Sequence, residues 1–235
     1  MQLFFCNNLI LNGEVILSQE ESYHAAQVLR MRNGDIIHLT DGIGHLFKGE
    51  LINVDSKKSL VLIIEEITQK IGDKNLHIAI APTKNIDRFE WFLEKATEMG
   101  IAEITPLLCR YSERKEIKTE RLNKVIVAAA KQSHHFKFPV LNSIVKFEDF
   151  IKSNSTENKF IAHCESSEKN DFGKAVIGKK STILLIGPEG DFSDQEIQLA
   201  ISNNYSPVSL GESRLRTETA GIYACAVFNA LAQDL

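Results

Sequence analysis

A regular alternation of apolar and amphipathic segments begins near residue 74 and constrains the fold most strongly. The apolar segments are NLHIAIAP, EITPLLC, KFIAHC, STILLIG and SPVSL, and a stretch long enough for a helix follows most of them. Short apolar strands that alternate with amphipathic helices are typical of a parallel sheet covered by helices. We therefore predict an α/β domain over residues 73–235.

Residues 1–72 have a different pattern, with short strand-like segments and turns. DIIHLT, HLFKGELINV and LVLIIEEI are separated by turn formers such as Asn33-Gly34 and Asp41-Gly42, and only SQEESYHAAQVLR has a helical pattern. This spacing predicts a small β-barrel or an open sheet. The change of pattern places the domain boundary in TQKIGDKN, residues 68–75.

Composition and charge restrict the compartment and the partners. The net charge is -4, so the whole chain has no excess of positive charge for nucleic acid, although the sum can hide a local basic segment. The four cysteines are far apart and form no C-x-x-C pair, which argues against a zinc site and a disulfide framework. No segment has the roughly 20 apolar residues of a membrane span, and the N-terminus lacks a signal peptide's basic region. We expect a cytoplasmic protein that binds neither metal nor membrane.

A capping-box pattern predicts one long helix in the second domain. Asp87 is followed three residues later by Glu90, and Gly100 stands where a glycine would end the helix. We predict a helix over residues 87–99.

The segment GPEGD, residues 187–191, lies between a buried strand and a second predicted helix. Ser193 and Glu196 form a capping box, so this helix begins at about Asp194. Open α/β sheets bind ligands at such a position, although the segment is neither a P-loop nor a G-x-G-x-x-G turn. It is either an ordinary turn or a ligand site whose acidic residue suits ribose hydroxyls, an amine or a cation.

Two arginines stand just before a third predicted helix, where the helix dipole disfavours cations. The threonines of RTETA can cap a helix that begins near Glu218, and Arg214 and Arg216 precede it. These arginines either pair with Glu189 or Glu218, or they bind an anionic partner such as a phosphate or a developing negative charge.

A basic segment, residues 110–137, contains eight Lys and Arg against three Glu, a net charge of +5. It is either a solvated helix face or a surface that binds a polyanion. His134 and His135 within it have no third ligand nearby and do not predict a metal site. Arg30 and Arg32 in the first domain are a weaker signal for RNA binding.

Together these residues resemble the ribosomal RNA small subunit methyltransferase E family, SPOUT-class enzymes that methylate N3 of a uridine in small-subunit (16S) ribosomal RNA with S-adenosylmethionine. The resemblance extends over the whole chain through HAAQVLRMRNGD, KNIDRFEWFLEKATEMGI, KQSHHFKFP, IGPEGDFSDQE and LGESRLRTETA. It implies an RNA-binding PUA-like β-barrel over residues 1–72 and a SPOUT-like α/β domain with a trefoil knot over residues 73–235. It also implies a homodimer, with the assembled small subunit as the substrate. Since unknotted connections are the strong default, the knot rests on the resemblance alone.

The resemblance further implies the residues of the site. The cofactor-binding residues would be His163, Cys164, Ile186, Gly187, Pro188, Glu189, Gly190, Leu210, Gly211, Ser213, Leu215 and Arg216. Arg216 would stabilise negative charge on the uracil, while Glu218 or Glu189 orients it or accepts the N3 proton through water. The RNA-binding residues would be Arg30, Arg32, Lys84, Arg88, Arg110, Lys131 and His135.

The chain departs from the family pattern at two positions. Asp191 stands where a second glycine is frequent, and His135 stands where an arginine is frequent. A neutral histidine is a poorer partner for phosphate than arginine.

Three other functions stay open on the sequence. A related SPOUT enzyme would methylate another atom, and a non-catalytic RNA-binding assembly factor would retain the pocket alone. The third is a doubly wound enzyme that acts on a small nucleotide, against which the missing phosphate-binding glycine motif argues.

Overall fold

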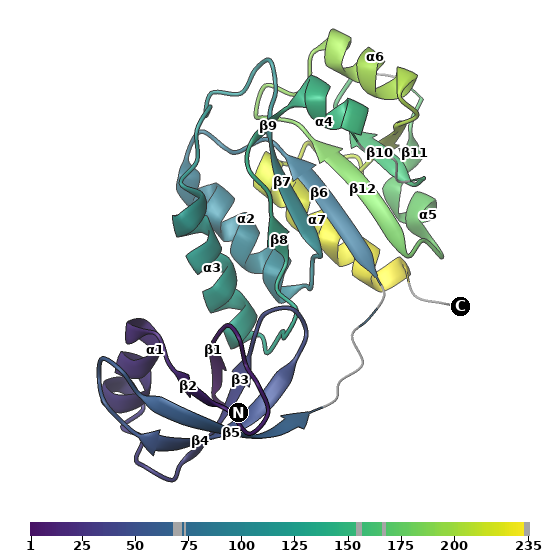
Figure 1. The fold of residues 1–235 in the computed structure, drawn as a ribbon. Helices are drawn as coiled ribbons and strands as arrows, with labels where there is room; N and C mark the ends of the chain where they lie inside the picture. Colours follow the sequence, from purple (N-terminus) through teal and green to yellow (C-terminus); the bar gives the residue numbers. More distant parts are fainter. Residues whose placement is uncertain (68–71, 73, 154–156, 166–167, 233–235) are drawn as a thin grey trace. The chain divides into compact units, whose positions relative to one another are not determined.

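The structure is a computed structural model of the 235-residue chain, and it describes residues 1–67, 72, 74–153, 157–165 and 168–232. The chain forms two compact units (Figure 1): Met1–Gly72 with Val127–Phe138, and Asp73–Ile126 with Pro139–Leu235. Most of the linker predicted at residues 68–75 lies outside the described residues.

The N-terminal unit contains a five-stranded sheet, as far as the described residues show, in the order β1-β3-β4-β5-β2. Its strands are β1 (Leu3–Phe5), β2 (Glu14–Ile16), β3 (Ile36–Thr40), β4 (Leu46–Asn53) and β5 (Leu60–Ile67). Only β1 and β3 pair in parallel. The helical residues are α1 (Gln19–Tyr23) and the π-helix η1 (His24–Val28). The three strands and the helical stretch predicted here are confirmed.

One face of this sheet carries the core of the N-terminal unit. The buried residues include Ile37 and Leu39 of β3 and Val61 of β5, with Ala25 of η1 in the same cluster. Residues 127–138 also belong to this unit, and Lys131 Nζ lies 2.5 Å from Glu21 Oε1.

The C-terminal unit contains a parallel sheet in the order β11-β13-β10-β12-β6-β7-β8, with β9 also paired to β7. The strands are β6 (Asn75–Ile80), β7 (Glu103–Leu108), β8 (Val140–Leu141), β9 (Val145–Lys146), β10 (Lys159–Ala162), β11 (Asn170–Asp171), β12 (Ser181–Ile186) and β13 (Ser206–Ser209). Every pairing between these strands is parallel. The predicted α/β architecture with its parallel sheet is therefore confirmed.

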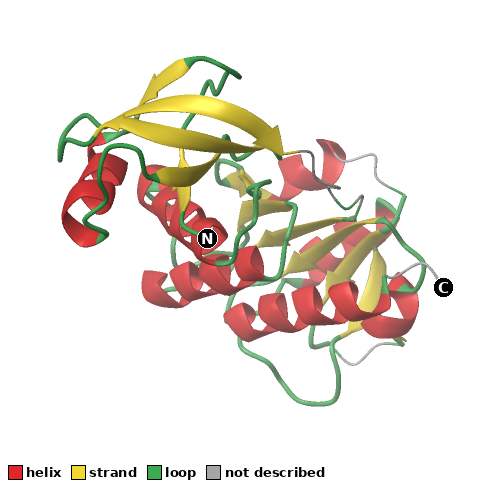
Figure 2. Cartoon of the chain, turned by 90° about the horizontal axis from the view of Figure 1, so that it is seen from below, coloured by secondary structure: helices red, strands yellow, loops and turns green. Residues whose placement is uncertain are grey.

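Helices cover both faces of this sheet (Figure 2). They are α2 (Ile86–Glu98), α4 (Phe147–Ser153), α5 (Phe172–Val176), α6 (Asp194–Ser202) and α7 (Thr217–Leu231). A further helix, α3 (Thr119–Gln132), has its first residues in this unit and its last residues in the N-terminal unit. One face packs against α4 and α6 through a cluster that includes Phe147, Phe192 and Leu185. On the other face, α7 packs against α2 and β6, and Gly221 allows close approach to Phe92 and Ile80.

The helix starts show where capping rules succeed and fail. The capping box of Ser193 and Glu196 is confirmed at the start of α6. The cap predicted at Asp87 is wrong, because Asn85 caps α2 and its side-chain oxygen accepts the Asp87 N–H at 3.0 Å. Asn and Asp cap helices almost equally well, so the sequence offers two competing start positions here.

Candidate functional site

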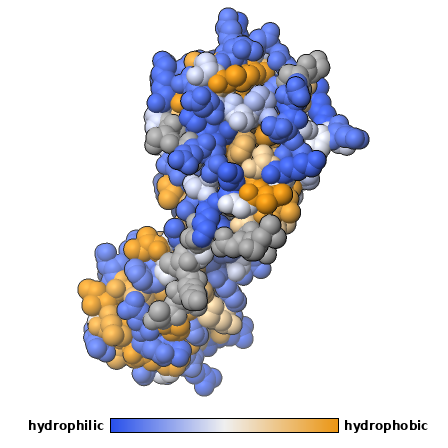
Figure 3. All heavy atoms as spheres, turned by 90° about the vertical axis from the view of Figure 1, so that its right-hand side faces the viewer, coloured by the Kyte–Doolittle hydropathy of each residue, from blue (hydrophilic) through white to orange (hydrophobic). Residues whose placement is uncertain are grey.

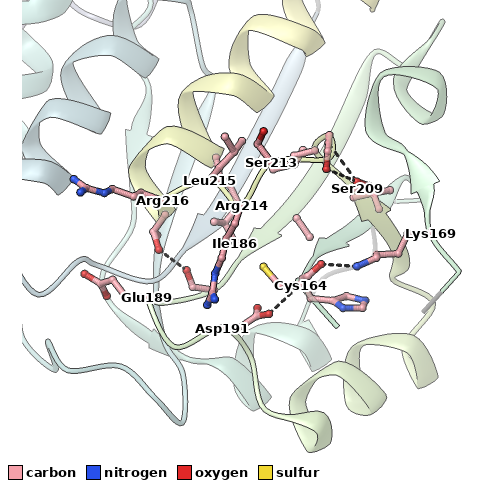
Figure 4. Close-up of a pocket in the computed structure, with 18 of the residues that line it drawn as sticks. Cys164, Lys169, Ile186, Glu189, Asp191, Ser209, Ser213, Arg214, Leu215 and Arg216 are labelled. Carbon is pink, nitrogen blue, oxygen red and sulfur yellow. Dashed lines mark hydrogen bonds between the residues drawn. The ribbon is translucent and has the colours of Figure 1, made fainter. Parts of the chain in front are cut away.

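A cavity of about 640 Å³ opens at the carboxyl ends of three neighbouring strands (Figure 4). Strands β13, β10 and β12 are adjacent and parallel, so their ends meet at one edge of the sheet. Ala162, Ile186 and Ser209, the last residues of these strands, all line the cavity. The walls are the loops that follow, so segments far apart in the sequence form one pocket.

Eleven of the twelve residues predicted to bind the cofactor line this cavity. They are His163, Cys164, Ile186, Gly187, Pro188, Glu189, Leu210, Gly211, Ser213, Leu215 and Arg216. Gly190 is not among the lining residues, and its α-carbon faces Tyr111. The prediction missed Ala162, Lys169, Asp191, Val208, Ser209, Glu212, Arg214, Thr217 and Ala220.

The GPEGD loop is held by contacts with other parts of the pocket wall. The Gly187 carbonyl accepts the Thr217 hydroxyl at 3.1 Å, and Glu189 Oε1 accepts the Lys84 N–H at 2.9 Å. A β-carbon on Gly187 would lie 3.1 Å from the Phe192 nitrogen. The loop is therefore more than an ordinary strand-to-helix turn, because it joins α7 and the residues after β6 to one ligand-sized cavity.

Asp191 adopts a backbone conformation that favours glycine. Its φ of 67° lies in the left-handed region that favours glycine, and Asp tolerates this conformation better than most residues. Its carboxylate accepts the Phe192 N–H at 2.8 Å and the Cys164 N–H at 2.7 Å. Asp191 thus links the GPEGD loop to the wall after β10, a role that a glycine could not perform.

Arg214 and Arg216 do not pair with the glutamates proposed for them. Both arginines are exposed and form no salt bridge with a described residue. Glu218 is instead 3.8 Å from Arg88, and Glu189 accepts a backbone N–H. Two cations therefore stand beside the start of α7 without a counter-ion, which favours an anionic or electron-rich partner. In Figure 4, Arg216 and Glu189 lie on one side of the pocket, and Cys164 and Lys169 on the other.

The predicted threonine cap of α7 is also wrong. Arg216 is the N-cap residue and makes no side-chain capping bond, while the Thr217 hydroxyl bonds to Gly187. The amide groups of this helix start are left for water or for a ligand.

His163 is a buried polar residue whose side chain has no partner in the part of the chain that the structure describes. It is 7% exposed, and neither ring nitrogen makes a hydrogen bond with a described residue. Burial, and then the charge of Lys169, lower the pKa of His163, which favours the neutral ring. Lys169 is held by the carbonyls of His163 and Glu165, at 2.9 and 2.6 Å. A buried imidazole without a partner at a cavity wall suits a ligand or an ordered water.

The lowered pKa of His163 predicts a loss of stability in acid. The unfolded chain takes up a proton near pH 6.5 that the folded chain binds less readily, so the free energy of unfolding falls as the pH drops below about 6.5. Thermal unfolding at about pH 7.5 and about pH 5.5 should show this dependence, and it should be shallower in His163→Gln. His77 and His38, whose pKa values burial also lowers, contribute to the dependence that remains. An identical pH dependence in the variant would contradict this account.

The predicted RNA-binding residues differ in how freely they present their charges. Arg30 and Arg32 are exposed in the N-terminal unit, where Lys131 is instead paired with Glu21. In the C-terminal unit, Lys84 pairs with Glu113, Arg88 lies near Glu218, and the Arg110 guanidinium bonds to Gln195. His135 is half-buried.

Several cations of the basic segment, residues 110–137, are already bonded to residues outside it. Arg114 donates to the carbonyls of Thr83 and Lys84, and Arg121 pairs with Glu90 at 2.6 Å. These contacts stabilise the C-terminal unit and leave fewer cations for a polyanion.

The described residues include no cluster of three or more His, Cys, Asp or Glu that could hold a metal ion. Among the helices that the structure describes, none has the length and apolar character to cross a membrane.

Comparisons with known proteins identify both units. A family model for an RNA methyltransferase domain matches residues 72–229, and a model for an RNA methyltransferase PUA domain matches residues 17–65. Ribosomal RNA small subunit methyltransferase E from Rickettsia conorii is 26% identical over 231 residues, covering 96% of this chain and 93% of the relative.

Solved structures agree over the whole chain. A probable rRNA methyltransferase from Porphyromonas gingivalis has a TM-score of 0.90 and 36% identity, covering 99% of this chain and 98% of that one. The ribosomal RNA small subunit methyltransferase E of Neisseria gonorrhoeae, bound to S-adenosyl methionine, has a TM-score of 0.85 and 26% identity, covering 98% of both chains.

The fold and the pocket thus define an RNA methyltransferase of the SPOUT type with an N-terminal PUA domain. Within this class, the chain belongs to the ribosomal RNA small subunit methyltransferase E family.

Proposed function

We propose that this protein methylates N3 of a specific uridine in small-subunit ribosomal RNA, with S-adenosylmethionine as the methyl donor. The family is one of S-adenosylmethionine-dependent rRNA methyltransferases. The observation that carries the proposal is the pocket at the ends of β10, β12 and β13, lined by two arginines that form no ion pair with a described residue. The target uridine must leave its stack or be unpaired, because N3 lies on the Watson-Crick edge.

The pocket residues fit S-adenosylmethionine. The cavity has a volume typical of sites for ligands of this size, and Ile186, Val208, Leu210 and Leu215 give it apolar walls. The unpaired His163 ring and the backbone of three strand ends supply hydrogen-bonding groups. When bound, the cofactor supplies a methyl group on a positively charged sulfur.

The chain's own residues mainly position the uridine and stabilise charge. The N3 atom of uracil is a poor nucleophile until its proton leaves, and this loss places negative charge on the neighbouring carbonyl oxygens. In this proposal the exposed Arg216 guanidinium, which lies at the edge of the pocket on the Glu189 side (Figure 4) and forms no ion pair with a described carboxylate, stabilises that charge. Alignment of the two reactants and exclusion of water supply the rest of the rate increase.

Glu189 and Glu218 have different positions relative to this chemistry. Glu189 is exposed and lines the pocket, so it accepts the N3 proton through water in this proposal. Glu218 is buried behind the first turn of α7, with Oε2 unpaired and Oε1 near Arg88. It contributes to catalysis by positioning α2 against the start of α7, where Arg216 stands.

The family resemblance extends the proposal to the assembly. The active form is a cytoplasmic homodimer whose cofactor site lies in a trefoil knot, and its substrate is the assembled small subunit. Ala220, Gly221 and Ala224 of α7 are buried within the C-terminal unit, where α7 packs against α2 and β6, so the homodimer rests on the resemblance alone.

Methyl-labelled S-adenosylmethionine and unmodified small ribosomal subunits test the reaction class. Label that follows the RNA and is released in a base-modified nucleoside supports the proposal. Label in an alkali-resistant dinucleotide would show ribose methylation and favour a related SPOUT activity. Cofactor binding without any label would favour a non-catalytic assembly factor.

The two exposed arginines of the N-terminal unit should contribute to RNA affinity. Arg30→Ala with Arg32→Ala should weaken binding to small-subunit RNA and reduce the slope of log affinity against log salt by about 2, since each cation releases about one counterion. Lys57→Ala with Lys58→Ala removes the same charge from another exposed loop and serves as the matched control. A salt slope that changes equally in both variants would rule out a specific contact.

A further inference from the structure

Part of the outer side of the N-terminal sheet carries aliphatic side chains, although the solvent-facing side of an antiparallel sheet is usually polar. Strand register places Ile36, Glu50, Leu62 and Glu14 in one row across β3, β4, β5 and β2. Leu60 and Ile16 lie in the next row, beside the polar Asn53. We call Ile36, Glu50, Leu62, Glu14, Leu60 and Ile16 the outer face. Ile16 and Ile36 are 58% and 48% exposed.

The outer face is distinct from the buried core. The neighbouring residues Ile37, Leu51 and Val61 point to the opposite side and are fully buried. Figure 3 shows hydrophobic side chains at the surface of the N-terminal unit. Ile16 and Ile36 lie on strands at opposite ends of this face, and the half-buried Leu60 and Leu62 lie between them, so the aliphatic side chains form a band that Glu50 interrupts. Such a band marks a candidate interaction surface, whereas a single exposed apolar side chain needs no explanation.

Two carboxylates give this surface its chemical preference. Glu14 and Glu50 stand directly opposite Leu62, one on each neighbouring strand, so they are about 10 Å apart at two strand spacings. Neither forms a salt bridge with a described residue, and Lys48 nearby is already paired with Glu65 at 2.6 Å. The surface therefore suits a partner with aliphatic side chains and with Lys or Arg placed to reach both carboxylates.

The same charges disfavour two other occupants. Residues 1–72 contain nine Asp and Glu against six Lys and Arg, and phosphates would be repelled by Glu14 and Glu50. A second copy of this chain, bound symmetrically, would bring the same carboxylates toward each other.

We propose that the outer face docks a basic, partly apolar protein segment of the small ribosomal subunit, separately from the RNA contacts of the enzyme. The inference rests on the proposed function only for the identity of the particle that carries this segment.

Reversing the two charges of the outer face tests the proposal, because a basic partner should then bind more weakly and an acidic one more tightly. Glu14→Lys with Glu50→Lys should weaken binding to purified small subunits about tenfold, because like charges would then face each other. The control is Glu20→Lys with Glu66→Lys, which gives the same change in net charge at exposed positions outside the outer face. Binding to protein-free small-subunit RNA should change equally in both variants.

Several outcomes would overturn the proposal. If the outer face contacts RNA, the Glu14 and Glu50 variant will bind subunits more tightly than the control. If it contacts a second copy, sedimentation will show a changed oligomeric state. If both variants bind subunits equally well, the outer face does not dock any part of the subunit.

A second measurement does not depend on charge reversal. A photo-crosslinking residue at position 16 should crosslink to a basic ribosomal protein in purified subunits, whereas a crosslink to RNA, to a second copy or to nothing would contradict the proposal. Both experiments measure binding. If the wild-type enzyme methylates an atom other than N3, the proposed reaction is wrong, but the results of these two binding experiments stay valid.

Discussion

Arg216→Ala should reduce the rate of methyl transfer about 100- to 1000-fold, the loss typical when one preorganised donor to a developing negative charge is removed. Arg216 is exposed at the edge of the cofactor pocket and pairs with no carboxylate in the part of the chain that the structure describes, so its charge is available to the uracil. Most of the pocket wall is unchanged by the substitution, and cofactor affinity should change little. Single-turnover kinetics with saturating S-adenosylmethionine, together with calorimetric titration of the cofactor, separate these two effects.

Two further variants make this test specific. Arg216→Lys retains the charge but loses the planar guanidinium, so it should restore only part of the rate. Arg214→Ala removes the neighbouring cation, whose charge acts toward Cys164, and should have a smaller effect. Native rates in Arg216→Ala with normal cofactor binding would remove this residue from the mechanism.

Gly221→Ala should destabilise the C-terminal unit by about 2 kcal/mol, although alanine favours helices by about 1 kcal/mol over glycine. The new β-carbon would lie 2.7 Å from Phe92 Cδ2 and 3.3 Å from Ile80 Cδ1, in a region where both side chains are fully buried. The melting temperature should fall by about 4–8 °C for a unit of this size. Differential scanning calorimetry measures this change.

A compensating substitution tests the cause. Phe92→Leu combined with Gly221→Ala should be less destabilised than the sum of the single variants, because the smaller side chain accepts the added methyl group. Strictly additive effects would show that the contact between α2 and α7 is not the source of the loss.

Much of the fold could be predicted from local patterns. The five apolar segments from residue 75 onward became β6, β7, β10, β12 and β13 because buried parallel strands are continuously apolar. Ser193 caps α6 as predicted, since both residues of its capping box, Ser193 and Glu196, lie within one helical turn of the sequence. The caps of α2 and α7 were missed. At α2, Asn85 competes with Asp87 for the cap position. At α7, the Thr217 hydroxyl donates to the Gly187 carbonyl, 30 residues away, and does not cap the helix.

The site was predictable where it follows the family motifs and less so elsewhere. Residues of IGPEGD and LGESRLRT line the pocket, but nothing local in the sequence indicated Lys169. The positive φ of Asp191 and its bond to Cys164 depend on the meeting of two loops that are 27 residues apart. The Lys131–Glu21 pair joins residues 110 positions apart, so a count of charges along the chain treated Lys131 as free.

The most direct test of the central claim is to identify the methylated nucleoside. Purified protein is incubated with S-adenosylmethionine and unmodified small subunits, and the digested RNA is analysed by mass spectrometry against authentic N3-methyluridine. We predict that the methyl group appears in N3-methyluridine and that Arg216→Ala forms this product about 100- to 1000-fold more slowly. A methyl group in any other nucleoside would contradict the proposed target atom.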